Sequence, residues 1–163
     1  MARVVLTLGD DISTDIIYPG RYMATVLPVE TPQYAFADDA AFNASLRSGE
    51  IAPGSVIVGG SNFGSGSSRE QAASTLKGWE LIVVARSFAR IFLQNAINLG
   101  LTTIICPEIE ASTGDTLEIG ETHVVNQTTG RSFAMAPLAP ARQAIVAAGG
   151  LIPYVRRRLQ EAS

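Results

Sequence analysis

The middle third of the chain alternates short apolar runs with segments whose apolar residues have helical spacing. The runs at residues 55–58, 80–85 and 101–105 are almost continuously apolar, which is typical of parallel strands buried on both faces. Residues 69–76 and 88–99 carry apolar side chains three and four positions apart, so we predict two helices there. This order allows few folds, because each crossover between parallel strands is right-handed. The chain is therefore predicted to be an α/β protein with a mostly parallel central sheet.

Glycines and apolar spacing define the ends and faces of these two helices. Gly78 and Gly100 each follow a predicted helix, and both are expected to close it as C-caps. In the second helix one face is expected to be buried, and it consists of Phe88, Ile91, Phe92, Ala96 and Leu99.

The flanking regions add further short elements. A β-branched run at residues 3–8 predicts a strand, and a long irregular stretch rich in proline follows at residues 10–31. Turn residues separate the other elements, which are expected as helices at 34–46, 138–148 and 154–161 and strands at 115–119, 122–126 and 131–134. Because no linker or repeat interrupts the pattern, residues 1–163 are predicted to form one domain.

The composition excludes several classes of protein. The 163 residues are 47% hydrophobic and 17% charged, which favours a folded protein over a disordered one. The net charge of −3 argues against a nucleic-acid-binding protein, which would normally present a basic surface. Apolar runs fall well short of the ~20 residues that span a bilayer, so no membrane helix is expected. The amino terminus lacks the apolar core of a signal peptide, so a cytoplasmic location is predicted.

Cysteine and histidine are almost absent from the chain. Cys106 is the single cysteine and His123 is the single histidine. A zinc site needs about four nitrogen or sulfur ligands and an iron–sulfur cluster needs several thiolates, so this chain alone can hold neither. Cys106 follows a strand-like run and is predicted to be a buried structural thiol, whereas His123 is predicted to lie on an exposed strand. We therefore assign no metal ligand to this chain.

A glycine- and serine-rich loop occupies residues 60–68, between a predicted strand and a predicted helix. The start of a helix presents unpaired N–H groups and the positive end of the helix dipole, and both favour an anion. Ser67 and Ser68 add hydroxyl groups, and Arg69 adds a guanidinium group that can bind a carboxylate. The motifs of Walker loops, dinucleotide-binding loops and serine hydrolases are missing. Two interpretations remain open at this point: an anion site, and a plain helix start that Ser67 or Ser68 caps.

Three separated motifs give the chain a resemblance to a known family. The opening motif reads GDDISTDII at residues 9–17, the loop and helix start read GSNFGSGSSRE at residues 60–70, and the downstream run reads ARSFARIF at residues 85–92. In this order the motifs closely resemble those of the aconitase-family swivel domain, over nearly the whole chain. The resemblance implies a swivelling β/β/α domain.

Because the domain stands alone here, it is similar to the small subunits of 3-isopropylmalate dehydratases and homoaconitases. In that family a separate large subunit carries three cysteines, a [4Fe–4S] cluster and the catalytic histidines. The resemblance thus implies a large catalytic partner and a small dicarboxylate substrate, with 2- and 3-isopropylmalate interconverted in leucine biosynthesis. The partner's iron would accept the leaving hydroxide. Apolar residues of segment 10–31 are candidates for the subunit interface. The basic tail at 156–158 is another candidate, but a solvated basic helix end, which the helix dipole favours, is the preferred interpretation of it.

The resemblance also assigns roles to individual residues. Ser67 matches the catalytic serine of the family, which takes and returns a proton at a substrate carbon. Ser68 and Arg69 match residues that bind a substrate carboxylate, and Asp15 matches an aspartate of the active site. Since a serine hydroxyl is a poor base, its alkoxide must be stabilised by N–H groups, a helix end and a nearby cation.

A second loop is expected to recognise the side chain of the substrate. Arg21, Tyr22, Met23 and Ala24 match this specificity loop, and some relatives that take a longer acidic substrate have Arg at the position of Ala24. Met23 and Ala24 therefore suggest an apolar substituent such as isopropyl. Members often have His where this chain has Gln71, a difference that can alter support of the active loop. Two alternatives stay open: the small subunit of a homoaconitase or another substituted-malate hydro-lyase, and a non-catalytic carboxylate-binding domain.

Overall fold

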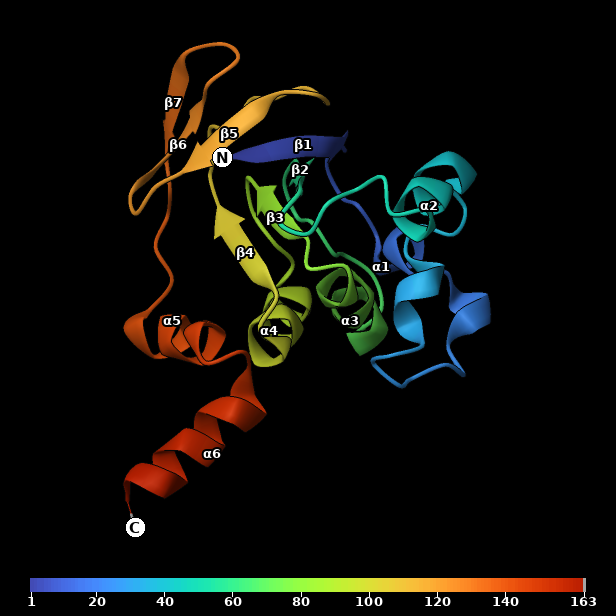
Figure 1. Ribbon diagram of the computed structural model, residues 1–163, viewed down its shortest axis with the longest axis vertical. Helices are drawn as coiled ribbons and strands as arrows, with labels where there is room; N and C mark the ends of the chain where they lie inside the picture. Colours follow the sequence, from blue (N-terminus) through green and yellow to red (C-terminus); the bar gives the residue numbers. More distant parts are fainter. Residues whose placement is uncertain (163) are drawn as a thin grey trace.

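The computed structural model describes residues 1–162, which form a seven-stranded sheet with helices packed against it (Figure 1). The strands stand in the order β4-β3-β2-β1-β5-β6-β7. They are β1 (Ala2–Thr7), β2 (Val56–Gly59), β3 (Ile82–Ala85), β4 (Thr102–Ile105), β5 (Thr116–Ile119), β6 (His123–Asn126) and β7 (Arg131–Ala134). The helices are α1 (Thr14–Ile17), α2 (Ala40–Arg47), α3 (Glu70–Gly78), α4 (Arg90–Leu99), α5 (Pro140–Ala147) and α6 (Leu151–Glu161), with 3-10 helices η1 (Gly20–Tyr22) and η2 (Thr31–Tyr34).

Strands β1 to β4 are parallel and lie side by side. All residues of β2 are buried, because side chains on both of its faces are covered by other layers. In register, Ile57 of β2 pairs with Val83 of β3, which in turn pairs with Thr103 of β4. Helices α3 and α4 connect these strands and lie together below them in Figure 1. The predicted α/β class and the parallel crossovers are confirmed.

Strands β5 to β7 are antiparallel and fold over the face of the parallel strands that α3 and α4 leave uncovered. One buried cluster joins side chains of both parts of the sheet: Val56, Val58, Val84, Ile104, Leu117, Val124 and Phe133. After β7 the chain returns to β4, where the N–H of Ala136 donates to the carbonyl oxygen of Ile105 at 2.8 Å. The layers are therefore β, β and α, as the resemblance implied.

The segment between β1 and α2 is more regular than its sequence predicts. The prediction of an irregular stretch is wrong at α1 and η1, where Ile17 and the following Tyr18 are fully buried. The helix predicted at residues 34–46 begins only at Ala40. Its N-cap is Asp39, whose Oδ1 accepts a hydrogen bond from the N–H of Phe42 at 3.1 Å. Long-range packing, which local spacing does not report, thus orders this segment.

Two predicted details of α3 and α4 are wrong. Gly78 is the last residue of α3 and not its cap, which is Trp79. A Cβ atom on Gly78 would lie 2.2 Å from Cγ of Pro32, so glycine is required there for close packing of η2 on α3. Ile91 is 50% exposed although it belongs to the predicted buried face of α4. The predicted cap at Gly100 is confirmed, with a φ of 76°.

Helix α5 lies within the predicted range 138–148, whereas α6 begins at Leu151, three residues before the predicted start at residue 154. Gly149 and Gly150 have φ values of 95° and 127° and separate α5 from α6. In Figure 1, α6 points away from the body of the protein, and its side chains Ile152 and Leu159 are each 66% exposed. Among residues 1–162, none of the helices is long and apolar enough to cross a membrane.

Candidate active site

The loop between β2 and α3 is bound to the segment after β1 through the two backbones. The N–H groups of Gly64 and Ser65 both donate to the carbonyl oxygen of Ile12, at 2.7 and 3.1 Å, and the N–H of Thr14 donates to Ser65 at 2.7 Å. The buried hydroxyl of Thr14 donates to the carbonyl oxygen of Ser67 at 2.9 Å. Two motifs that lie far apart in the sequence therefore form one structure at the carboxyl end of β2, where ligands bind in open parallel sheets.

Two glycines allow this loop to pack closely against its neighbours. Gly64 has a φ of 86°, and a Cβ atom there would lie 2.3 Å from Cγ of Phe92 on α4. Gly66 has a φ of 96°, and its Cβ atom would lie 2.9 Å from Oγ of Ser13. A side chain at either position would displace the loop, so the glycines determine the backbone path that leads to Ser67.

Ser67 and Ser68 are exposed at the amino end of α3. Within the part of the chain that the structure describes, neither hydroxyl group has a hydrogen-bond partner. The N-cap of α3 is Arg69, which makes no capping bond with its side chain. The interpretation of Ser67 or Ser68 as the helix cap is therefore wrong. The first turn of a helix without a side-chain cap presents free N–H groups, and an anion can accept hydrogen bonds from them.

Arg69 forms an ion pair with Asp15 of α1. Its Nη1 lies 2.7 Å from Oδ1 of Asp15 and also donates to the carbonyl oxygen of Tyr18 at 3.1 Å. The N–H of Gly20 donates to the same oxygen of Asp15 at 2.8 Å. Hydrogen bonds from Arg69 and Gly20 hold the pKa of the Asp15 carboxyl below its usual value, so it is ionised at neutral pH. The Arg69 side chain is 15% exposed, and its Nε is buried without a partner among residues 1–162.

The predicted specificity loop begins beside this ion pair. A Cβ atom on Gly20 would lie only 3.2 Å from Nη2 of Arg69. Further along, the carbonyl oxygen of Met23 accepts a hydrogen bond from Nε2 of Gln71 at 3.2 Å. The side chain of Met23 is 40% exposed, and Ala24 is also exposed. The loop is thus held next to the amino end of α3, with two apolar side chains at its surface.

Arg21 and Tyr22 are engaged in contacts within the chain. Nη2 of Arg21 lies 2.6 Å from Oδ1 of Asp38, and the guanidinium carbon lies 4.7 Å from the centroid of the Tyr22 ring. The hydrogen bond to Asp38 raises the pKa of Arg21. Tyr22 stacks on Tyr34, with ring centroids 4.0 Å apart. Direct binding of a ligand by Arg21 would use the N–H groups that Asp38 leaves unpaired.

Comparison with known proteins assigns the chain to a family. The profile of the family described as the Aconitase C-terminal domain matches residues 19–109, which include the loop and both helices of the parallel part. The chain belongs to the aconitase C-terminal domain family. Relatives of this family also match the chain along most of its length.

Two curated proteins and one solved structure show how similar this chain is to known aconitase-type domains. The 3-isopropylmalate dehydratase small subunit of Moorella thermoacetica is 44% identical over 94% of this chain and 93% of that protein. The isopropylmalate/citramalate isomerase small subunit of Methanocaldococcus jannaschii is 41% identical over 97% of this chain and 95% of that protein. A crystal structure of the 3-isopropylmalate dehydratase from M. jannaschii superimposes with a TM-score of 0.89 at 38% identity, and covers 99% of this chain and 95% of that chain.

The single thiol of this aconitase-type domain is placed in the core. Cys106 is fully buried, its Sγ donates to the carbonyl oxygen of Ala134 at 3.4 Å, and burial raises its pKa to about 11. His123 is exposed on β6, so the predicted settings of both residues are confirmed. Within residues 1–162, no group of three or more His, Cys, Asp or Glu side chains could hold a metal ion. The described residues therefore do not fit an iron–sulfur cluster.

Two residues that contact the candidate site, Thr14 and Tyr18, are not among the predicted site residues. Thr14 positions the backbone of Ser67, and the signal was its place in the opening motif beside Asp15. Tyr18 contacts Arg69 through its carbonyl oxygen, but nothing in the sequence around it distinguishes it from an ordinary core aromatic residue.

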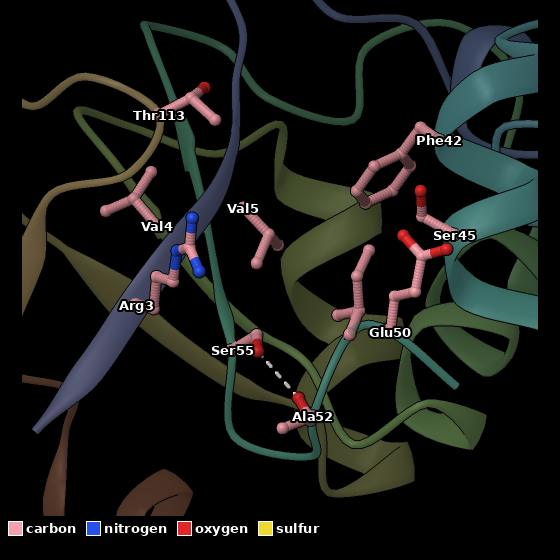
Figure 2. A pocket seen from close by; sticks show the side chains of 10 residues that line it. Arg3, Val4, Val5, Phe42, Ser45, Glu50, Ala52, Ser55 and Thr113 are labelled. Carbon is pink, nitrogen blue, oxygen red and sulfur yellow. Dashed lines mark hydrogen bonds between the residues drawn. The ribbon is translucent and has the colours of Figure 1, made fainter. Parts of the chain in front are cut away.

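A cavity of about 370 Å³ lies at the opposite end of the parallel strands (Figure 2). Ser55 lines it at the amino end of β2 and donates to the carbonyl oxygen of Ala52 at 2.6 Å. Arg3 and Glu50 also line this cavity, whereas none of the candidate site residues does. The cavity is therefore separate from the loop that follows the carboxyl end of β2.

Proposed function

We propose that this chain is the small subunit of a 3-isopropylmalate dehydratase, a hydro-lyase that interconverts 2- and 3-isopropylmalate in leucine biosynthesis. The observation that carries the proposal is a pair of hydroxyl groups, on Ser67 and Ser68, that have no hydrogen-bond partner among residues 1–162. They lie next to the largely buried Arg69 side chain, which is paired with the exposed carboxylate of Asp15. The names of the relatives from Moorella thermoacetica and Methanocaldococcus jannaschii support this reaction.

Ser67 is proposed to remove and return the proton at the substrate carbon. A serine alkoxide forms only where positive potential stabilises it. The N–H groups of the first turn of α3, the dipole of this helix and the guanidinium group of Arg69 all lie at the same end of the helix as Ser67. Exclusion of water from the site would strengthen each of these interactions.

Ser68 and Arg69 are proposed to bind a substrate carboxylate, and Asp15 is proposed to orient the Arg69 side chain for that contact. Asp15 and the carbonyl oxygen of Tyr18 hold the guanidinium group through Nη1, and Nη2 and Nε keep N–H groups without a partner in residues 1–162. A buried donor without a partner is costly, so a carboxylate that reached Nε would relieve that cost. Holding the guanidinium group in advance also reduces the entropy that substrate binding must overcome.

A large subunit is proposed to cover this site and to carry the [4Fe–4S] cluster, because the residues of this chain do not fit a cluster. The segment next to the site exposes five large apolar side chains, between 40% and 87%: Ile16, Met23, Val26, Leu27 and Val29. We name these five residues the apolar rim. Exposed apolar side chains are common at protein interfaces, so we propose that the large subunit contacts the rim. The assembled enzyme is proposed to work in the cytoplasm on a small dicarboxylate.

The substituent of the malate is the least constrained part of the proposal. Met23 and Ala24 offer an apolar surface, which favours isopropylmalate. One relative is named for both isopropylmalate and citramalate, so a methyl-substituted malate is the second candidate. A homocitrate-type substrate would bring a further carboxylate, and Ala24 supplies no cation to bind it. A non-catalytic carboxylate-binding domain would instead bind a diacid without any partner.

The test is turnover by the complex reconstituted with its large subunit, on isopropylmalate, methyl-substituted malate and homocitrate-type substrates. Ser67→Ala should leave co-purification intact and lower turnover by ~100-fold or more, as expected for the loss of acid–base catalysis. The control is Ser112→Ala, which removes another exposed hydroxyl on the loop before β5. Near-normal turnover of Ser67→Ala would contradict the role of this serine. Diacid binding by the isolated chain, with no turnover by any complex, would favour the non-catalytic alternative.

A further inference from the structure

The specificity loop contains a reverse turn, and one buried hydroxyl group donates hydrogen bonds to the carbonyl groups of the first and last residues of this turn. The N–H of Thr25 donates to the carbonyl oxygen of Tyr22 at 3.0 Å, which defines the turn Tyr22–Thr25. The hydroxyl group of Tyr18 lies 3.0 Å from the carbonyl oxygen of Tyr22 and 3.2 Å from that of Thr25, and it donates to both. Tyr18 is fully buried, and burial raises its pKa, so its hydroxyl group keeps the proton that it donates.

A second hydrogen bond holds the middle of the same turn. Nε2 of Gln71 donates to the carbonyl oxygen of Met23 at 3.2 Å. Gln71 lies in the first turn of α3, two residues after Arg69, so the turn is attached to the helix end that presents the candidate catalytic residues. The carbonyl groups at positions 22, 23 and 25 are thereby all bound by side chains, and the side chains of Met23 and Ala24 are left at the surface.

Aromatic packing connects the turn to α3 by an independent route. The Tyr18 ring meets the rings of Tyr22 and Tyr34 edge-on, at centroid distances of 6.5 and 6.1 Å. Tyr34 ends η2, which is fixed to the α3 region by two hydrogen bonds of 2.7 Å. In these bonds the hydroxyl group of Thr75 donates to Thr31, and Nε1 of Trp79 donates to Pro32. The serine loop and the reverse turn lie on two sides of the site, and both are therefore attached to α3.

We propose that Tyr18, assisted by Gln71, is a positioning residue that holds Met23 and Ala24 in one arrangement and so determines which substituent of the malate is accepted. The inference rests on the proposed function, in which this turn contacts the substrate side chain. The Tyr18 side chain is buried beneath the turn and acts only through it, whereas the backbone carbonyl oxygen of Tyr18 contacts Arg69 and is unchanged by a substitution of the side chain. The physical reason is that a turn with three bound carbonyl groups cannot adapt its surface to a smaller substituent without breaking hydrogen bonds.

The first experiment compares Tyr18→Phe with the wild-type holoenzyme on isopropylmalate and on the methyl-substituted substrate. Phenylalanine keeps the ring packing and removes only the hydroxyl group. We expect the ratio of the two kcat/KM values to fall about threefold to tenfold, with most of the change in KM, because one hydrogen bond has that worth. The control is Tyr154→Phe on α6, where the hydroxyl group contacts only Arg158 at 3.4 Å among the residues described.

Two further measurements separate positioning from a purely structural role. Gln71→Leu removes the second anchor, and Gln71→His restores a donor, so the ratio should fall in the first variant and recover in the second. Hydrogen exchange of the Thr25 amide should accelerate in Tyr18→Phe while the thermal midpoint of the complex changes little.

The outcomes distinguish this inference from the proposed function. An active wild-type enzyme whose discrimination is the same in Tyr18→Phe and Gln71→Leu would overturn the positioning role and leave the proposed function intact. A correctly assembled wild-type complex that converts neither substrate would overturn the proposed function and this inference together. A changed ratio in the Tyr154→Phe control would also overturn the inference, because the effect would not be specific to the turn.

Discussion

A methyl group added at Gly20 would displace the ion pair that is proposed to bind the substrate carboxylate. Gly20 does not have a positive φ, so its backbone accepts alanine without strain. The added Cβ atom would lie 3.2 Å from Nη2 of Arg69 and 3.3 Å from Oδ1 of Asp15. Ordinary contacts between such atoms lie at about 3.5–4.0 Å, so the guanidinium and carboxylate groups must move by a few tenths of an ångström.

This movement should affect binding more than folding. Replacing glycine by alanine at a compatible position stabilises a protein by roughly 0.4–1 kcal/mol, which offsets a mild close contact and keeps Tm within about 4 °C of wild type. A hydrogen bond to a charged group contributes about 1.5–3 kcal/mol. Weakening the bond between Arg69 and the substrate by about half therefore raises KM roughly fourfold to tenfold.

The assay is steady-state kinetics of the reconstituted complex on isopropylmalate, with thermal unfolding followed by circular dichroism. Gly9→Ala is the matched control, since a Cβ atom on Gly9 would meet nothing within 4 Å and Gly9 does not have a positive φ. We expect KM to rise for Gly20→Ala only. A folded Gly20→Ala enzyme with the wild-type KM would refute the argument that the position of Arg69 limits substrate binding.

Three other predictions concern charge and assembly. Arg69→Lys should raise KM by about tenfold or more, because lysine cannot offer two parallel hydrogen bonds to a carboxylate; an unchanged KM would count against this role. The lowered pKa of Asp15 should stabilise the fold above its usual value of 3.8, a contribution lost as pH falls through the lower folded value. In acid unfolding curves the gap between wild type and Asp15→Asn should therefore narrow below pH 3.8, and a constant gap would disprove the linkage. Replacing both Leu27 and Val29 by serine should weaken co-purification of the large subunit, whereas the control Ile152→Ser on α6 should not; equal losses would remove the rim from the interface.

The parallel part of the fold could be predicted from the sequence because its strands are buried on both faces. Such strands read as continuous apolar runs, and the structure places β2, β3 and β4 within one or two residues of the predicted positions. The buried face of α4 was predicted less well, since Ile91, which was expected to be buried, is half exposed and Ile97, which was not expected on that face, is fully buried. Helical spacing identifies an apolar face but not which of its edges the neighbouring elements cover.

The residue types of the candidate site could be predicted from the sequence, but its local geometry could not. Glycines and serines before a helix indicated a ligand-binding loop, yet a helix cap by Ser67 or Ser68 was equally compatible with the sequence. The structure excludes that cap because Arg69 occupies the N-cap position of α3. Asp15 pairs with Arg69, and Thr14 donates to the carbonyl oxygen of Ser67. Both contacts depend on the segment after β1, and single-segment patterns carry no information about such distant partners.

The exposure of Ser67 bears on why the chain would need a partner. In water an alkoxide competes with solvent, and the helix dipole and a guanidinium group are screened at an open surface. The same groups stabilise charge far better once the site is covered, because the local dielectric constant falls. The isolated chain thus holds an arranged but solvated site, with Arg69 already bound to Asp15 and the hydroxyl group of Ser67 unpaired among residues 1–162. Covering by a large subunit at the apolar rim would exclude water from this site, so catalysis and assembly are expected to depend on the same surface.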